Sequence, residues 1–263
     1  MEQTLFISNP SGLKYYQKDF TRIYFGQEFC ERLLPSKDEL EKLCVFSKKE
    51  GVPLTLVTPY VTDKGLLKLE KLIDLFAEKM PGSEVVFNDW GVFQFIEENH
   101  LDVRLVLGRL LNKQKRGPRI TNIIDQVPKE TREYYTGASL DVSATAEFLK
   151  KKGILRVEFD NLLQGLNMTG LDPEIKRSLY LPYLFISTTR FCLTANCDKE
   201  DQGVGVMPCR MECKKYTFNL NNPVMKTPLI RKGNTVFVVN ENIPDVVSKG
   251  EVDRIVIQPE IPV

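Results

Sequence analysis

The sequence predicts an α/β protein whose parallel sheet closes into a (β/α) TIM-like barrel. Short β-type runs alternate with amphipathic helical segments, which is typical of parallel βα units. The length of 263 residues suits a single barrel, and no internal repeat, low-complexity stretch or Gly/Ser linker divides the chain. Residues 1–263 are therefore expected to form one domain. The barrel can be irregular where it closes, and an open doubly wound sheet is the alternative.

The first half of the chain shows the alternation clearly. Residues 36–51 predict a helix with Ser36 as N-cap, Glu39 at the capping-box position and Gly51 as the stop. Residues 64–80 repeat apolar side chains at helical spacing. The other expected elements are strands at 22–26, 53–61, 84–89 and 102–108 and a short helix at 90–99. Strands followed by helices are what a parallel barrel requires.

The second half is less regular. Its expected elements are a helix at 144–153, a strand at 154–159, an apolar run at 182–188, a strand at 235–241, a helix at 243–250 and a strand at 254–261. The total is about seven or eight strands. Because barrel chemistry lies at the carboxyl ends of strands, we expect one rim to carry residues 26–30, 58–60, 88–89, 108–109 and 187–192.

Composition limits the classes of function. An apolar fraction of 42% is enough to form a hydrophobic core. The chain has 36 basic and 35 acidic residues, so its net charge does not favour binding to nucleic acid or to an anionic membrane. The N-terminal residues lack a basic stretch followed by an apolar run, and no apolar segment approaches the roughly 20 residues of a membrane span. We therefore expect a soluble, cytoplasmic protein, whose six cysteines are metal ligands or redox thiols rather than disulfides.

Four cysteines fall within 22 residues: Cys192, Cys197, Cys209 and Cys213. Thiolates are the usual ligands of iron-sulfur clusters, and zinc is the competitor. Neither pair has the C-x-x-C spacing that structural zinc sites favour, so the spacing favours iron. Buried free thiols are the plain alternative. Cys44 lies in an amphipathic helix and is expected to pack in the core.

Four segments, in order, resemble motifs of the U32 peptidase family: IYFGQEFC, FNDWGV, STTRFCLTAN and PCRMEC. The resemblance spans nearly the whole chain and is closest to the single-barrel, UbiV-like branch. It implies a 4Fe-4S cluster held by Cys30, Cys192, Cys209 and Cys213. Cys197 is a fifth candidate, which competes with Cys30 for one position or supplies a nearby redox thiol. The cysteine loop from Asn196 to Met207 is expected to become ordered when a cluster binds.

The resemblance also implies a function, which is oxygen-independent hydroxylation of a quinone precursor or an RNA base. Proteins of the UbiV-like branch work as pairs of homologous barrels. The expected partners are therefore a homologous barrel protein and a small aromatic substrate or RNA. The alternative is a non-catalytic electron-transfer or scaffold partner. Asp89 of the FNDWGV turn and Arg156, which alone matches the family's mid-barrel Arg motif, are candidate substrate-binding residues, while the catalytic residues stay unassigned.

A basic run is the one local charge patch with functional character. It comprises Arg109, Lys113, Lys115, Arg116 and Arg119, follows a strand end, and could hold an anionic small molecule or a phosphate backbone, with Arg109 as a further candidate substrate-binding residue. A solvated loop is the alternative. Tyr134 and Tyr135 could stack a ring or a base, although core packing is the more usual role of such aromatics.

Peptidase activity is the reading the sequence favours least. His100 is the sole histidine and falls between a helix and the following strand, which places it on the amino-terminal face of a barrel as an exposed loop residue. Nucleophilic proteases need a base beside the nucleophile.

Overall fold

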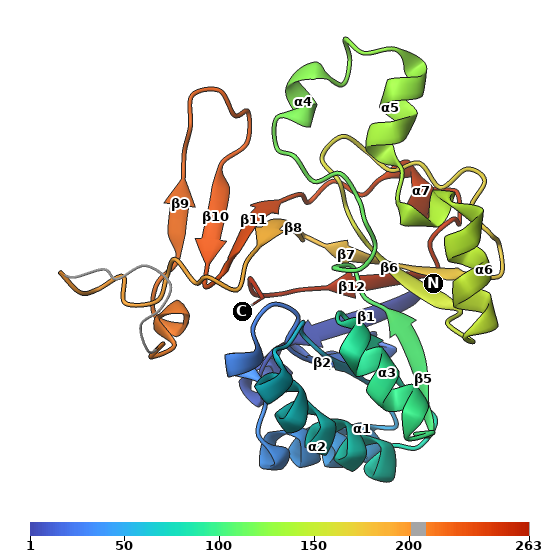
Figure 1. Cartoon of the computed structure of the whole chain (residues 1–263), viewed down its shortest axis with the longest axis vertical. Coiled ribbons are helices and arrows are strands. Elements are labelled where there is room, and N and C mark those ends of the chain that lie inside the picture. The colour runs from blue at the N-terminus through green and yellow to red at the C-terminus, as the bar shows by residue number, and fades with distance from the viewer. Residues whose placement is uncertain (201–208, 263) are drawn as a thin grey trace.

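Eight parallel strands close into a barrel, as the sequence predicted (Figure 1). The computed structural model describes residues 1–200 and 209–262. The barrel strands in spatial order are β1 (Glu2–Ile7), β12 (Arg254–Ile257), β7 (Lys176–Leu181), β6 (Arg156–Asp160), β5 (Val103–Leu107), β4 (Ser83–Phe87), β3 (Leu54–Val57) and β2 (Arg22–Gly26). β2 pairs with β1 and thereby closes the barrel.

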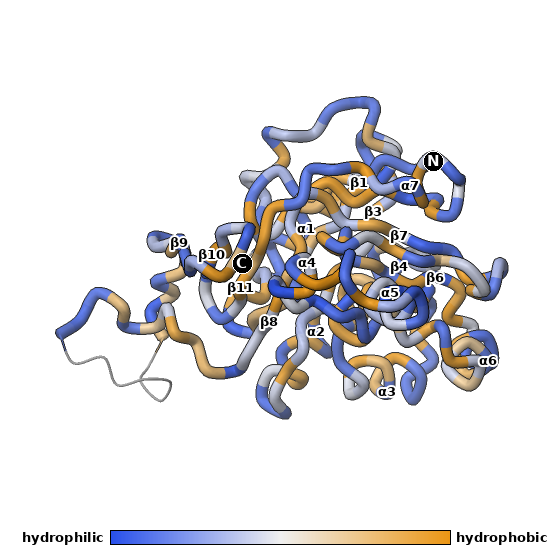
Figure 2. Tube along the Cα trace, turned by 90° about the horizontal axis from the view of Figure 1, so that it is seen from above, coloured by the Kyte–Doolittle hydropathy of each residue, from blue (hydrophilic) through white to orange (hydrophobic). Residues whose placement is uncertain are grey.

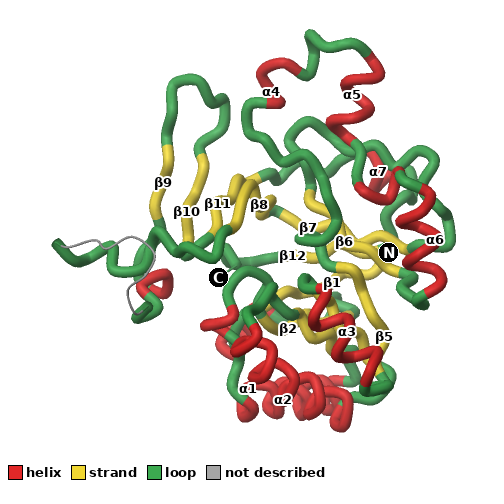
Figure 3. Tube along the Cα trace, viewed as in Figure 1, coloured by secondary structure: helices red, strands yellow, loops and turns green. Residues whose placement is uncertain are grey.

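The helices lie outside the barrel and join its strands. They are α1 (Lys37–Glu50), α2 (Asp63–Lys79), α3 (Trp90–Glu98), α4 (Ile120–Ile123), α5 (Lys129–Thr136), α6 (Ser143–Lys151) and α7 (Asp245–Ser248), with short 3-10 turns η1 (Pro10–Tyr15), η2 (Glu31–Leu33), η3 (Ser139–Asp141) and η4 (Glu212–Lys214). Figure 3 shows α1, α2 and α3 together on one side, where they cover the first βα units. No helix of the described residues is long and apolar enough to cross a membrane.

Helix α1 begins and ends where the sequence predicted. The Glu39 backbone N–H donates to Ser36 Oγ (3.2 Å), and the Ser36 backbone N–H donates to Glu39 Oε2 (2.7 Å), which completes the capping box. Gly51 adopts φ +66° at the C-cap. Local side-chain chemistry therefore fixes both ends of this helix.

Two predicted strands lie outside the barrel. β8 (Tyr183–Thr188) and β11 (Thr235–Val239) pair in an antiparallel sheet with β10 (Leu229–Lys232) and β9 (Phe218–Leu220), in the order β8-β11-β10-β9. This sheet extends away from the barrel in Figure 1. The places of β8 and β11 in the barrel are filled by β1 and β7, which the sequence patterns did not identify. The barrel prediction is therefore confirmed, but two of the expected strands were wrongly assigned to it.

Alternation along the strands produces two apolar layers. Outward-facing side chains such as Leu5, Ile23 and Leu54 are fully buried in the large core between strands and helices. Cys44 belongs to this core, as predicted. A smaller cluster consists of Phe6, Tyr24, Val57, Val86, Val106, Tyr180 and Val256. Figure 2 shows the apolar residues concentrated along the strands and the hydrophilic ones on outer loops.

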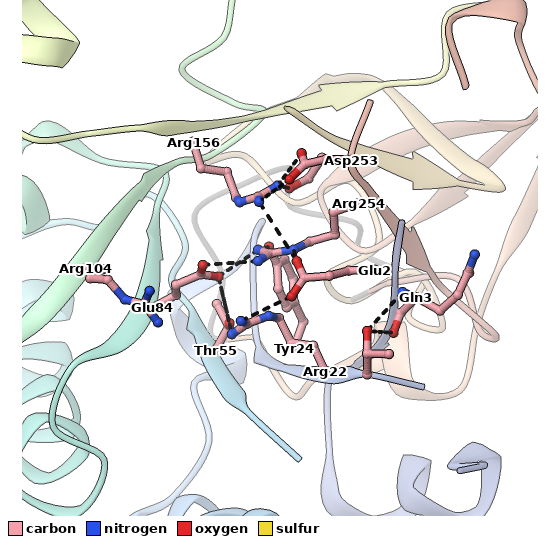
Figure 4. Close-up of polar contacts among 12 residues, drawn as sticks. Glu2, Gln3, Arg22, Tyr24, Thr55, Glu84, Arg104, Arg156, Asp253 and Arg254 are labelled. Carbon is pink, nitrogen blue, oxygen red and sulfur yellow. Dashed lines mark hydrogen bonds and ion pairs between the residues drawn. The ribbon is translucent and has the colours of Figure 1, made fainter. Parts of the chain in front are cut away.

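Charged side chains form a network at the amino-terminal ends of the strands (Figure 4). Arg254 Nη1 and Nη2 donate to Glu84 Oε2 (2.6 Å) and Oε1 (3.1 Å), and Arg254 Nε binds Glu2. Arg22 lies 3.5 Å from Glu84. Burial alone would raise the pKa of Glu84, but the hydrogen bond and charge of Arg254, with the charge of Arg22, lower it to about 2. The network ties β1, β2, β4 and β12 together at this end.

Candidate metal centre

Cys30 reaches the carboxyl-terminal rim through a tight turn after β2. Gly26 ends the strand with φ +142°, and a Cβ atom there would meet the Val57 carbonyl oxygen at 2.0 Å. Only glycine fits this close approach of the two backbones. The chain then passes Phe29, which is buried, and places the half-buried Cys30 directly before η2.

Cys192 lies beyond the end of β8. Thr194 Oγ1 donates to the Gly233 carbonyl oxygen (2.8 Å), which fixes the cysteine loop to the turn between β10 and β11. The chain returns at Cys209 and Cys213, where Cys213 lies in η4 and is buried. The Met211 backbone N–H donates to Cys209 Sγ (3.3 Å). Residues 201–208, which the sequence placed in the expected cluster loop, lie outside the described residues.

Asn234 joins the segments that carry the cysteines. Its Nδ2 atom donates to the Phe29 carbonyl oxygen (2.6 Å), to the Thr189 carbonyl oxygen (2.9 Å) and to the Tyr60 hydroxyl (2.8 Å). Phe29 follows β2, Tyr60 follows β3 and Thr189 follows β8. One amide therefore holds the Cys30 turn against the start of the cysteine loop.

Four cysteines line one cavity. Cys30, Cys192, Cys209 and Cys213 surround a space of about 50 Å³, to which Arg32, Arg190 and Asn234 also contribute. These are the four positions that the family resemblance implied. Cys197 is half-buried and is not among the described residues that line this cavity.

Burial disfavours the thiolate form of three cysteines of the cavity, Cys30, Cys192 and Cys213. Burial raises the pKa of Cys213 to about 11, and the neighbouring Cys30, Cys192 and Cys209 add to the effect. Burial also raises the pKa of Cys30 and of Cys192. Binding of a metal group would therefore release protons from these thiols.

The donor set fits a sulfur-ligated metal group. Among the described residues, the cavity is lined by four thiols and the Met211 thioether but by no carboxylate or imidazole, and soft thiolates suit iron-sulfur clusters and zinc. Among residues 1–200 and 209–262, no group of three or more His, Cys, Asp or Glu side chains is arranged to hold a single metal ion. A tetrahedral zinc ion with Zn–S bonds of about 2.3 Å would need sulfurs only about 3.8 Å apart. Four thiols are also the usual number of ligands of an iron-sulfur cluster.

Cations and aromatic rings surround the cysteines. Arg190 Nη2 donates to the Val61 carbonyl oxygen (3.2 Å), and neither Arg190 nor Arg32 forms an ion pair with a carboxylate of the described chain. Phe29 packs against Phe237 with ring centroids 5.2 Å apart, in the same buried cluster as Cys213. Arg32 and Arg190 therefore place positive charge beside the cavity, whereas the buried Glu212 carboxylate lies 3.9 Å from Cys209 Sγ.

Arg109 lies in a buried network of charged and polar groups. It is fully buried and donates to Glu28 (2.8 and 2.6 Å), to Asp160 (2.8 Å) and to the Tyr183 carbonyl oxygen (2.8 Å). Arg116 Nε also binds Asp160 (2.7 Å). Two cations of the predicted basic run are therefore neutralised inside the protein, and the run does not form the expected patch as a whole.

The other candidate substrate-binding residues have structural contacts. Asp89 is the N-cap of α3, where it accepts hydrogen bonds from the Gly91 backbone N–H (2.7 Å) and the Val61 backbone N–H (3.1 Å). Arg156 starts β6 at the amino-terminal end of the barrel and pairs with Asp253 (2.9 and 2.7 Å). Neither residue lines the cysteine cavity.

Two other predictions concern residues remote from the cysteines. His100 is exposed between α3 and β5, at the amino-terminal end of the barrel, as predicted. Tyr134 is exposed rather than packed in the core, and the Lys115 ammonium lies 4.0 Å from its ring centroid.

Sequence reasoning missed the polar residues that accompany the cysteines. Arg190 stands two residues before Cys192 and Arg32 two residues after Cys30, so proximity to a cysteine was an available signal for both. Asn234 and Lys232 lie in the β10–β11 hairpin, and nothing local in the sequence connects that hairpin with the cysteines.

Comparison with known proteins adds support for the fold. No protein-family model and no curated protein matches the sequence. A solved U32 peptidase matches over 100% of this chain and 94% of that chain, with a TM-score of 0.52 and 14% identity. A family 18 N-acetylglucosaminidase from Paenibacillus barengoltzii matches 97% of this chain and 94% of that chain, with a TM-score of only 0.34 and 9% identity. A class V chitinase from Cycas revoluta matches 98% of this chain and 94% of that chain, with a TM-score of 0.32 and 10% identity. The chain therefore has the closed barrel fold of a U32 peptidase, and the likeness at this identity concerns the fold alone.

Proposed function

We propose that this protein binds a 4Fe-4S cluster through Cys30, Cys192, Cys209 and Cys213 and acts in redox chemistry. The observation that carries the proposal is that thiols from widely separated parts of the chain line one cavity at the carboxyl-terminal rim of the barrel. Cys30 and Cys192 are 162 residues apart in sequence. A chance group of structural cysteines would not collect at the rim where barrels of this class carry their chemistry.

The residues around the cavity would assist cluster binding through their charge and through exclusion of water. Arg32 and Arg190 line the cavity and would offset part of the negative charge that four thiolates bring. The buried rings of Phe29, Phe185 and Phe237 pack in the same apolar cluster as Cys213 and keep water from that side of its thiol. When bound, the cluster would supply transfer of single electrons.

We further propose that the electrons serve oxygen-independent hydroxylation of a quinone precursor or an RNA base, as in the UbiV-like branch that the motifs resemble. Four cysteine ligands leave no open coordination position, so electron transfer is a simpler task here than direct activation of a substrate. A homologous barrel protein would be the partner. The second candidate is a non-catalytic electron-transfer or scaffold subunit of that same pair.

Peptidase activity has less support, although the solved relative carries that name. The sole histidine, His100, lies at the amino-terminal end of the barrel, whereas the cysteines lie at the carboxyl-terminal rim. No imidazole can therefore act as a base beside these thiols.

Anaerobic purification tests the proposal. We expect about four iron and four sulfide per chain and a broad visible absorbance shoulder that dithionite bleaches. One zinc per chain without sulfide would overturn the cluster assignment. Co-purification of a homologous barrel protein would support the paired role, and hydroxylation of a substrate by this protein alone would contradict it.

A further inference from the structure

A second and larger hollow adjoins the cysteine cavity. It has a volume of about 390 Å³ and shares three wall residues with that cavity: Arg32, Leu33 and Met211. Its floor includes Asn9 and Gln27, which follow the paired strands β1 and β2. The hollow therefore lies on the carboxyl-terminal rim, where ligands of α/β barrels bind. Its size falls in the range of small-molecule sites.

Three cations line this basic hollow, namely Arg32, Lys214 and Lys232. None of them forms an ion pair with any carboxylate in the described part of the chain. Lys232 is half-buried, and its Nζ atom donates to the Ile261 carbonyl oxygen (3.2 Å), which fixes the ammonium group at the wall. Three positive charges thus converge on the hollow, and of these Lys232 also interacts over a longer distance with the Glu260 carboxylate.

Two carboxylates also line the hollow. Glu39 Oε2 accepts from the Ser36 backbone N–H (2.7 Å) in the capping box of α1 and keeps its negative charge. Glu260 Oε1 accepts from the Tyr15 hydroxyl (2.7 Å) and lies 3.0 Å from Lys14 Nζ, which pairs with it. Because three cations line the hollow and Lys14 pairs with one of its two carboxylates, positive charge remains in excess, and an anionic ligand would neutralise it.

We propose that the basic hollow binds the carboxylate or phosphate group of a small organic molecule, with the remainder of the molecule directed along Leu33 and Met211 toward the cysteines. The inference deepens the proposed function and rests on it for the role of the ligand, which would be the substrate of the redox reaction or a molecule that accompanies it. Binding itself depends on the cations and the cavity, and not on iron.

Isothermal titration calorimetry on the full-length protein tests the inference. Benzoate, neutral benzamide of nearly the same shape, and inorganic phosphate would be titrated into the protein as purified and into a chelator-treated sample. We expect benzoate to bind and benzamide not to bind. Phosphate binding about as strong as benzoate binding would identify the shared anionic group as the recognised element, and much weaker phosphate binding would assign the site to carboxylates.

Matched variants locate the site. The double variant Lys214→Ala/Lys232→Ala should weaken benzoate binding about tenfold or more, because it removes two charged partners. Lys214→Arg/Lys232→Arg should restore binding, and Lys68→Ala, an exposed change on α2, should leave it unchanged. Equal binding of benzamide and benzoate, or unchanged binding in the folded double Ala variant, would overturn the inference. If the anaerobically purified protein contains no iron but still binds benzoate, the cluster proposal is refuted and the anion-binding inference is not.

Discussion

The network at the amino-terminal end of the barrel makes a quantitative prediction about stability. Glu84 is 7% exposed, receives two hydrogen bonds from Arg254 and lies 3.5 Å from Arg22. Its pKa falls from 4.5 to about 2 in the folded protein. At about 1.4 kcal/mol for each pH unit, that difference corresponds to roughly 3 kcal/mol of free energy of unfolding at neutral pH.

The perturbation is Glu84→Gln, which keeps the shape of the side chain and removes its charge. We expect the free energy of unfolding at pH 7 to fall by about 3 kcal/mol, since Arg254 and Arg22 lose a buried counter-charge. Glu78→Gln is the control, because Glu78 is exposed and forms only a surface pair with Lys79. That change should alter stability by less than about 0.5 kcal/mol.

The pH dependence gives the sign of the effect. A carboxyl group whose pKa is lowered in the folded state stabilises the protein above its unfolded pKa, and this contribution is lost as the pH falls through the folded value. The difference between the wild type and Glu84→Gln should therefore be full above pH 4.5 and shrink as the pH falls toward 2. Urea denaturation at pH 7, 5, 4 and 3 measures it. Equal midpoints for Glu84→Gln and Glu78→Gln at pH 7, or a difference that does not change with pH, would refute the reasoning.

Two further predictions concern single residues of the barrel. Gly26→Ala should lower the thermal midpoint far more than Gly51→Ala, because a Cβ at Gly26 meets the Val57 carbonyl oxygen at 2.0 Å whereas nothing lies within 4 Å at Gly51; similar midpoints for the two variants would contradict this. Burial raises the pKa of Glu158 from 4.5 to about 8, so its contribution to stability should decline as the pH rises from 4.5 through 8. Glu158→Gln should remove that decline in urea titrations at pH 6 and pH 9, and an identical slope in the wild type and the variant would argue against a protonated Glu158.

The accuracy of the sequence predictions follows the range of the interactions involved. Helix α1 was predicted to the residue because Ser36, Glu39 and Gly51 act within a few positions of one another. Strand β7 was missed because it begins with the charged residues Lys176 and Arg177, so its apolar part is too short to be recognised as a strand from the sequence. Strands β8 and β11 were recognised but assigned to the barrel, since a local pattern does not reveal which sheet a strand joins.

In the candidate site, too, contacts between residues far apart in the sequence were harder to predict than local ones. Cys30 follows barrel strand β2, as predicted, but Cys192 follows β8, which lies in the antiparallel sheet and not in the barrel. The two cysteines meet through contacts such as those of Asn234 with Phe29 and Thr189, so the predicted meeting rested on the wrong assignment of β8. The position of Arg109 could not be expected. Its side chain turns inward because Glu28 and Asp160, which lie 81 and 51 residues away, neutralise it there. The basic hollow was missed for the same reason, since Arg32, Lys214 and Lys232 come from three distant segments.

The measurement that tests the central claim most directly is the iron and sulfide content of single cysteine variants purified without oxygen. Alanine at Cys30, Cys192, Cys209 or Cys213 should each remove most of the iron, because these four thiols line the cavity. Cys44→Ala should keep the full iron content and cost only about 1 kcal/mol of packing, since Cys44 lies in the core. Loss of the cluster in Cys197→Ala together with full iron in Cys30→Ala would contradict the account and assign the ligands to the four late cysteines.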